Sequence, residues 1–86
     1  MLLGEQVTDE EYLNDLKKII LSFDLVIDVD SLIVLKYGFN YQITSEVVMD
    51  KNIILKDAHD VLELIEEKLK EYDLKIKYIT IHINPN

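Results

Sequence analysis

Two segments of the chain carry apolar residues at the spacing of an amphipathic helix. The first follows Thr8, which together with Glu11 forms the pattern of a capping box, and it predicts a helix over residues 9–22 with Thr8 as its N-cap. The second predicts a helix over residues 55–72. Its inner stripe consists of six residues: Ala58, Val61, Leu62, Ile65, Leu69 and Tyr72.

Three further segments carry the pattern of β-strands. Residues 25–37 are rich in β-formers, and the unbroken apolar run over residues 32–35 indicates that both faces of this strand become buried. A turn at Gly38-Phe39-Asn40 separates it from a second strand over residues 41–49. The third strand, residues 75–84, alternates and ends at Pro85. One of its faces carries Ile79, Ile81 and Ile83, and the other carries Tyr78, Thr80, His82 and Asn84.

The order of these elements, αββαβ, predicts a single α+β domain over residues 1–86. We expect an open-faced sandwich, a ferredoxin-like variant in which two helices cover one face of a three-stranded mixed sheet. Residues 1–7 precede the first helix and are interpreted as a leader. The other face of the sheet is left open, and the apolar run of the first strand favours its partial cover by a second copy of the chain.

The charge of the chain limits its partners. The 86 residues include 9 Lys, no Arg and 17 Asp or Glu, which gives a formal net charge of −8. Nucleic-acid binding through a basic surface is therefore not expected, and an anionic membrane surface would repel the domain. Cations are the natural partners of such a field, although acidity can also serve solubility alone. The absence of cysteine excludes disulfides and thiolate metal sites, and no apolar run is long enough to span a bilayer.

The candidate chemistry lies in five residues: Asp30, Glu46, His59, His82 and Asn84. His82 and Asn84 are two apart on a strand and therefore share a face. Carboxylates, an amide oxygen and imidazoles converging from several elements would hold a divalent ion. Each residue also has an ordinary reading as a surface or turn position.

Other chemistry finds less support in the sequence. His59 and Glu63 are spaced i, i+4 on the second helix, which favours a local pair over a ligand set. The serines lie in no nucleophile motif, and we expect no enzymatic activity.

Taken together, residues 29–85 resemble the C-terminal cytoplasmic domain of cation diffusion facilitator transporters. The resemblance rests on the strand pair around Gly38, on the segment from Glu46 to Asp50 that leads into Ala58-His59, and on the terminal Ile81-His82-Ile83-Asn84-Pro85. It implies a homodimer on the cytoplasmic side of the membrane, attached to a transmembrane domain that lies outside this chain and acts as a metal/proton antiporter. Metal binding near the dimer interface would draw the protomers together and favour transport.

The resemblance also assigns residues by position. His59 and His82 match histidine ligands of the family, Asn84 matches an aspartate ligand, and Asp30 and Glu46 match histidines of bacterial members. Zinc is the family's usual metal, but this oxygen-rich set indicates weaker zinc binding or a shift toward manganese or iron. Ile54 stands where the family has a Ser or Thr helix cap, so the second helix should begin less firmly.

Three hypotheses remain open at this stage. The first is a metal-sensing dimerisation domain of a divalent cation efflux transporter. The second is a structural dimerisation module without a functional metal site. The third is a free-standing binding protein of this fold.

Overall fold

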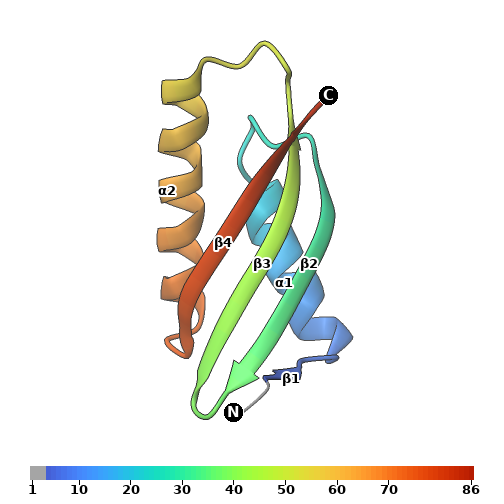
Figure 1. Ribbon diagram of the computed structural model, residues 1–86, viewed down its shortest axis with the longest axis vertical. Helices are drawn as coiled ribbons and strands as arrows, with labels where there is room; N and C mark the ends of the chain where they lie inside the picture. Colours follow the sequence, from blue (N-terminus) through green and yellow to red (C-terminus); the bar gives the residue numbers. More distant parts are fainter. Residues whose placement is uncertain (1–3) are drawn as a thin grey trace.

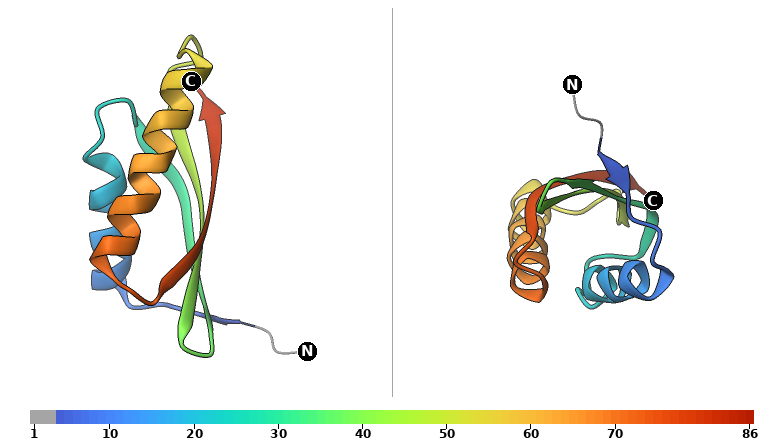
Figure 2. Two further views of the ribbon diagram at one scale, coloured as in Figure 1. Left: turned by 90° about the vertical axis from the view of Figure 1, so that its left-hand side faces the viewer. Right: turned by 90° about the horizontal axis from the view of Figure 1, so that it is seen from below.

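The computed structural model describes residues 4–86 and contains two helices on one face of a four-stranded sheet. Figures 1 and 2 show both helices on the same side of the curved sheet. In the order β1-β2-β3-β4, the first two pairings are antiparallel and the pairing of β3 with β4 is parallel. The elements are β1 (Glu5–Gln6), α1 (Glu10–Leu21), β2 (Asp28–Tyr37), β3 (Asn40–Met49), α2 (Leu55–Tyr72) and β4 (Ile76–Pro85).

This arrangement confirms the predicted open-faced α+β sandwich and adds one short strand. Within the segment interpreted as a leader, Glu5–Gln6 pairs with Lys36 and Leu35 at the edge of the sheet. Residues 1–3 of that leader lie outside the described residues. Strand β1 could not be predicted from the sequence, because a strand of two residues is too short to show an alternating pattern.

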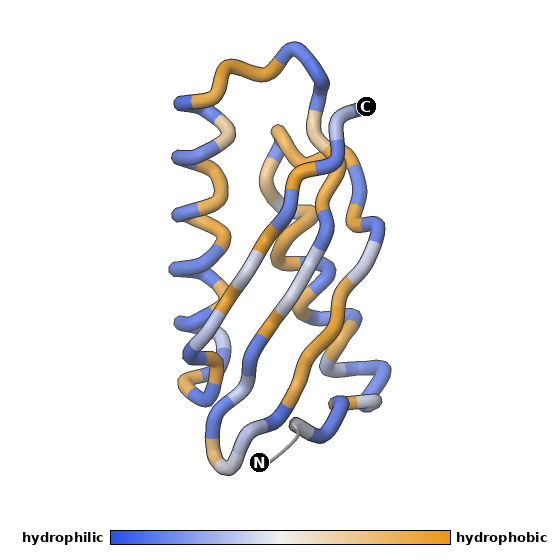
Figure 3. Tube along the Cα trace, viewed as in Figure 1, coloured by the Kyte–Doolittle hydropathy of each residue, from blue (hydrophilic) through white to orange (hydrophobic). Residues whose placement is uncertain are grey.

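Strand β3 is central and alternates strictly between two environments. Its core-facing side chains, Ile43, Ser45, Val47 and Met49, are fully buried under the helices. The three apolar ones pack with Leu16 and Ile20 of α1 and with Ala58, Ile65 and Leu69 of α2. In Figure 3 polar and apolar residues are mixed along β3, and they alternate most clearly along its neighbour β4. The helices bury apolar area on one face only, which leaves the polar set on the open face.

Strand β2 contains a bulge that the sequence pattern does not reveal. Val29 pairs with Val47 and Ser31 pairs with Glu46, so Asp30 is an extra residue between them. The fully buried Ser45 hydroxyl donates to the Ser31 carbonyl beside the bulge at 2.8 Å. This bond gives a buried hydroxyl its partner and fixes the irregular segment against β3.

Both helices differ slightly from their predicted details. The N-cap of α1 is Asp9 rather than Thr8, since the Asp9 carboxylate accepts from the backbone N–H of Glu11 and Tyr12. A carboxylate is at least as good a cap as a hydroxyl and adds charge at the positive end of the helix. Helix α2 has the predicted bounds and, as expected, Ile54 provides no side-chain cap.

The inner stripe of α2 is shorter than predicted at its C-terminal end. Tyr72 is 45% exposed, and its hydroxyl donates to Asp15 of α1 at 2.8 Å. A tyrosine can lay its ring on neighbouring side chains while its polar tip stays in water, which explains the error.

A tyrosine cluster ties the lower ends of both helices to the sheet. The Tyr12 hydroxyl at the start of α1 donates to the Asp73 carboxylate after α2 at 2.7 Å. The Tyr12 ring packs edge-on against Tyr41 of β3, with ring centroids 5.7 Å apart. Asp73 also accepts from the backbone N–H of Lys75, so one carboxylate joins α1, α2 and the start of β4.

Replacement of Tyr12 by Phe tests this junction. Y12F keeps the ring but removes the donor to Asp73, and we expect a loss of about 1–2 kcal/mol in the free energy of unfolding, measured by urea denaturation. Y72F is the matched control, because the Tyr72 hydroxyl bonds Asp15 from an exposed side chain, and its loss should cost clearly less. Equal losses in the two variants would contradict a special role for the Tyr12–Asp73 bond.

The same bond predicts an effect of pH. Partial burial alone would raise the pKa of Asp73, but the Lys75 N–H, the Tyr12 hydroxyl and the Lys75 ammonium outweigh it and lower the pKa. A carboxylate whose pKa is lower in the folded state than in the unfolded state stabilises the fold at pH values above its unfolded pKa of about 4. This stabilisation is lost as the pH falls through the pKa of the folded state. In Y12F the Asp73 pKa should move back up, so acid unfolding should begin at a higher pH than in the wild type.

Candidate metal site on the open face

The open face of the sheet gathers most of the candidate residues from three strands. Glu46 lies in the middle, with Ser31 of β2 opposite it on one side and His82 of β4 opposite it on the other. Asn84 pairs with Val48 two residues further along the same face. The parity of the strands therefore brings together residues that are up to 54 positions apart in the chain.

Asn84 links the two carboxylates directly. Its amide nitrogen Nδ2 donates to Asp30 Oδ2 at 3.0 Å and to Glu46 Oε1 at 3.2 Å. The bulge makes this contact possible, because it lets Asp30 reach the cluster alongside its neighbour Ser31. The predicted convergence of Asp30, Glu46 and Asn84 is thus present, with the amide nitrogen rather than the oxygen facing the carboxylates.

Ser31 is a member of the cluster that sequence reasoning missed. Its hydroxyl donates to Glu46 Oε2 at 3.0 Å, so both oxygens of Glu46 accept a hydrogen bond. The bonds from Asn84 and Ser31, together with the nearby His82, hold the pKa of Glu46 below its ordinary value against the opposing effect of partial burial. Glu46 is therefore an anion at neutral pH. The sequence signal for Ser31 was the register of the hairpin, because the pairing that starts at Tyr37 and Asn40 continues without interruption to Ser31 and Glu46.

The two histidines do not meet within one chain. His82 is exposed on the open face beside Glu46. His59 lies on α2, in the layer on the other side of the sheet, and its Nε2 contacts Glu63 Oε1 at 3.0 Å with the His59 side chain 69% exposed. The local i, i+4 pair expected from the sequence is present, and a metal bound by both histidines would need a second copy of the chain.

The donor set on the open face fits a hard divalent cation better than a soft one. It offers two carboxylates, a serine hydroxyl, an amide and one imidazole. Within residues 4–86 no three histidine, aspartate or glutamate side chains lie close enough together to enclose a metal ion. Asp30 and Glu46 would hold such a cation, and the Asn84 nitrogen now contacts both of these carboxylates. The residues therefore suit a cation that enters by replacing that amide group.

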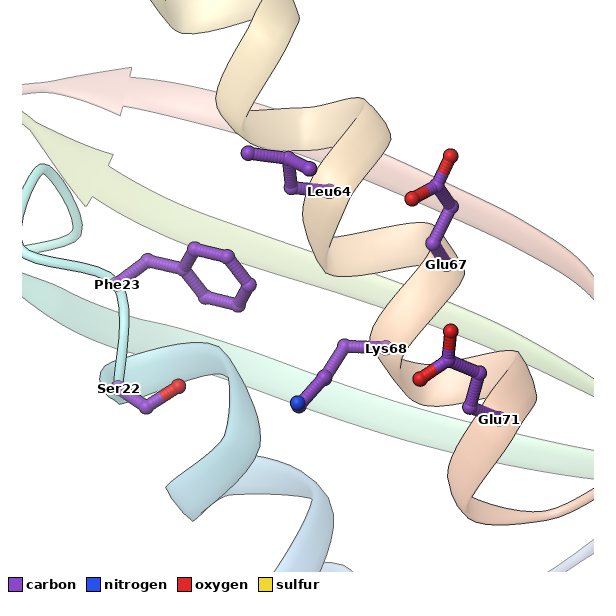
Figure 4. Close-up of a pocket in the computed structure, with 6 residues that line it drawn as sticks. All are labelled: Ser22, Phe23, Leu64, Glu67, Lys68 and Glu71. Carbon is purple, nitrogen blue, oxygen red and sulfur yellow. The ribbon is translucent and has the colours of Figure 1, made fainter.

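Two shallow grooves lie elsewhere on the described part of the chain. One of about 350 Å³ runs between the end of α1 and α2 and is lined by Ser22, Phe23, Leu64, Glu67, Lys68 and Glu71. Figure 4 shows Phe23 pointing toward α2 and Lys68 pointing toward α1. The other, of about 300 Å³, lies at the start of α2 and is lined by Leu25, Asp50, Asn52, Ile53, Ile54 and Asp57. Neither includes a member of the open-face cluster.

Comparison with known proteins identifies the family. The family described as "Cation efflux protein, cytoplasmic domain" matches residues 8–86. The chain belongs to this family. None of the helices of residues 4–86 is long and apolar enough to cross a membrane.

Solved structures of cation diffusion facilitator cytosolic domains share the fold. The cytosolic domain of a cation diffusion facilitator family protein superposes with a TM-score of 0.80 at 23% identity, covering 87% of this chain and 89% of that one. A cadmium form of the MamM CTD gives a TM-score of 0.82 at 14% identity, covering 92% and 99%. A nickel form of the same domain gives 0.81 at 14% identity, covering 90% and 98%.

A curated relative is a whole transport protein. The manganese efflux system protein MneP of Bacillus subtilis (strain 168) is 24% identical over 84 residues, which are 98% of this chain and 28% of that protein. The chain thus spans little more than a quarter of this relative's length.

Replacement of Ser45 by Ala tests whether the buried hydroxyl supports the cluster. S45A removes the bond to the Ser31 carbonyl, and we expect a loss of about 1–3 kcal/mol in the free energy of unfolding. S22A is the matched control, since the Ser22 hydroxyl bonds the Ile19 carbonyl at an exposed helix end. Amide chemical shifts of Ser31 and Glu46 should move in S45A and stay in place in S22A, and unchanged shifts in both would contradict the role of Ser45.

Proposed function

We propose that this domain is the cytoplasmic regulatory part of a divalent metal cation efflux transporter, that it forms a homodimer, and that it binds a divalent cation to favour transport. The metal/proton antiport itself belongs to a transmembrane domain outside the chain. No catalytic step is part of this proposal. The domain would lie on the cytoplasmic side of the cell membrane as part of an integral membrane protein.

The observation that carries the proposal is the convergence of anionic and imidazole groups on the open face. Asp30, Glu46 and His82 come from three different strands, and a bulge and the strand register bring them to one patch. The related domains with cadmium and nickel forms, and the manganese efflux relative, support a divalent metal as the ligand. The predominance of oxygen donors favours manganese or iron over zinc.

The charge of the domain gives the metal a regulatory role. Each chain carries a formal net charge of −8, so two copies repel each other at short range, within about 8 Å at physiological salt. A bound cation would neutralise part of that charge where the protomers approach. The cation would shift the equilibrium of the dimer toward a closed arrangement. The size of this shift equals the difference in the cation's binding free energy between the open and closed forms.

An apolar edge near the start of α2 is suited to contact between protomers. Leu25, Ile27, Ile54 and Leu55 are between 43% and 84% exposed, and Leu25 and Ile54 line the groove of about 300 Å³. His59 follows Leu55 by one turn of α2. A dimer formed through this edge would bring His59 to the interface, where it could join ligands of the other protomer.

One observation favours the alternative, a structural dimerisation module without a functional metal site. The hydrogen bonds from Asn84 and Ser31 already satisfy Glu46, and Asp30 has its own bond from Asn84. A metal-free cluster is therefore held together without any cation.

Calorimetric titration separates the two functions. We expect Mn²⁺ to bind the wild type in the micromolar to millimolar range, and the variant His59→Ala/His82→Ala to bind at least tenfold more weakly because both imidazoles are lost. Thr80→Ala, on the same face of β4 as His82, is the control and should bind like the wild type. If neither Zn²⁺ nor Mn²⁺ gives a heat of binding with the wild type, the purely structural module is favoured.

Replacement of Leu55 by Glu tests the dimer edge. Leu55 is 84% exposed at the first position of α2, where an acidic residue suits the helix, so L55E should fold and yet be monomeric at tens of micromolar by light scattering. L64E is the matched control, because Leu64 is also exposed on α2 but lies nine residues further along, on the opposite side of the helix. A wild type that is monomeric with and without metal would contradict the dimer.

A further inference from the structure

The orientation of the Asn84 amide is fixed by the groups that it contacts. Its two N–H donors can satisfy Asp30 Oδ2 and Glu46 Oε1, and both bonds have good lengths, 3.0 and 3.2 Å. Ionised carboxylates only accept hydrogen bonds, so the amide oxygen would find no partner in this place. The side chain must therefore turn its nitrogen, which cannot ligate a metal, toward the carboxylates.

We propose that Asn84 is a competitor of the cation rather than a ligand: its amide group holds Asp30 and Glu46 together in the metal-free domain and must be displaced before a divalent ion binds them. This inference rests on the proposed metal-binding function and concerns the regulation of that site. Asn84 would set the cation concentration at which the domain responds.

The energetics follow from the contacts. Entry of a cation breaks two hydrogen bonds to charged acceptors, each of which contributes more than a neutral bond does. The Ser31 hydroxyl contacts the other oxygen of Glu46 and does not obstruct a cation at Oε1. The cost of metal entry is thus concentrated in one side chain. A carboxylate at position 84 would behave in the opposite way, since three anions would repel one another until a cation arrived.

Replacement of Asn84 by Ala gives opposite results for a competitor and for a ligand. If Asn84 competes, N84A removes the displaced group, and Mn²⁺ should bind about tenfold tighter than to the wild type by calorimetry. If the amide oxygen were a ligand, N84A would bind more weakly. Asn14→Ala, an exposed asparagine on α1, is the matched control and should leave the affinity unchanged. Weaker or unchanged binding by N84A overturns the inference.

A second variant keeps the test valid if N84A folds poorly. N84D retains the size of the side chain but replaces two donors with a third anion. We expect its Tm in EDTA to fall below that of the wild type and to rise on addition of Mn²⁺ by more than the Tm of the wild type rises. A Tm in EDTA equal to that of the wild type would show that Asn84 does not hold the carboxylates together, and it would overturn the inference.

These outcomes distinguish this inference from the proposed function. Binding of Mn²⁺ by the wild type that weakens in N84A overturns the competitor role and leaves the metal-binding function intact. No binding of Mn²⁺ at millimolar concentration by the wild type, N84A or N84D overturns both.

Discussion

The rest of the structure depends on the register of β3. This strand bonds to β2 on one side and to β4 on the other, so its alternation determines which side chains of all three strands face the helices. Ile43, Val47 and Met49 are fully buried, and a slip by one residue would put Glu46 in their place. The free-energy cost of burying a carboxylate without partners is much larger than the gain from burying an apolar side chain. The apolar core and the polar open-face cluster therefore favour the same register.

The bulge at Asp30 modifies that register without disturbing the core. It lets Val29 and Val34, which a regular strand would turn to opposite faces, both remain buried under the helices. Ser45 secures the irregular segment from the core side, while Ser31 and Asn84 secure it from the open side. The polar cluster is therefore also a structural device, which explains how two carboxylates can lie close together in a chain that already carries a large negative charge.

Periodicity was enough to predict most of the fold, because both helices and the strands over residues 41–49 and 75–84 bury one face each. The apolar run over residues 32–35 indicated a strand that is buried on both faces, whereas within one chain Ile33 is 43% exposed. Periodicity also placed Glu46, His82 and Asn84 on the open face, since strand parity follows directly from sequence position. It could not reveal the bulge, because the extra residue lies between Val29 and Ser31, before the apolar run over residues 32–35, and leaves no mark on that run. The position of Asp30 depends on that bulge, whereas Ser31 lies opposite Glu46 in the regular register of the hairpin. Thr8 was preferred to Asp9 as the cap of α1 because Glu11 follows Thr8 at the spacing of a capping box, whereas the Asp9 carboxylate is the group that accepts the backbone bonds.

The chemistry of Asn84 shows where sequence reasoning about ligands ends. An amide side chain offers either an acceptor or two donors, and only its neighbours decide which end is used. With two carboxylates on one side, the donor end is favoured, and the residue becomes a substitute for the cation that those carboxylates would otherwise attract. A change from carboxylate to amide in such a site therefore removes a ligand and also installs a competitor. The strength of metal binding then depends as much on what stabilises the empty site as on the ligands that remain.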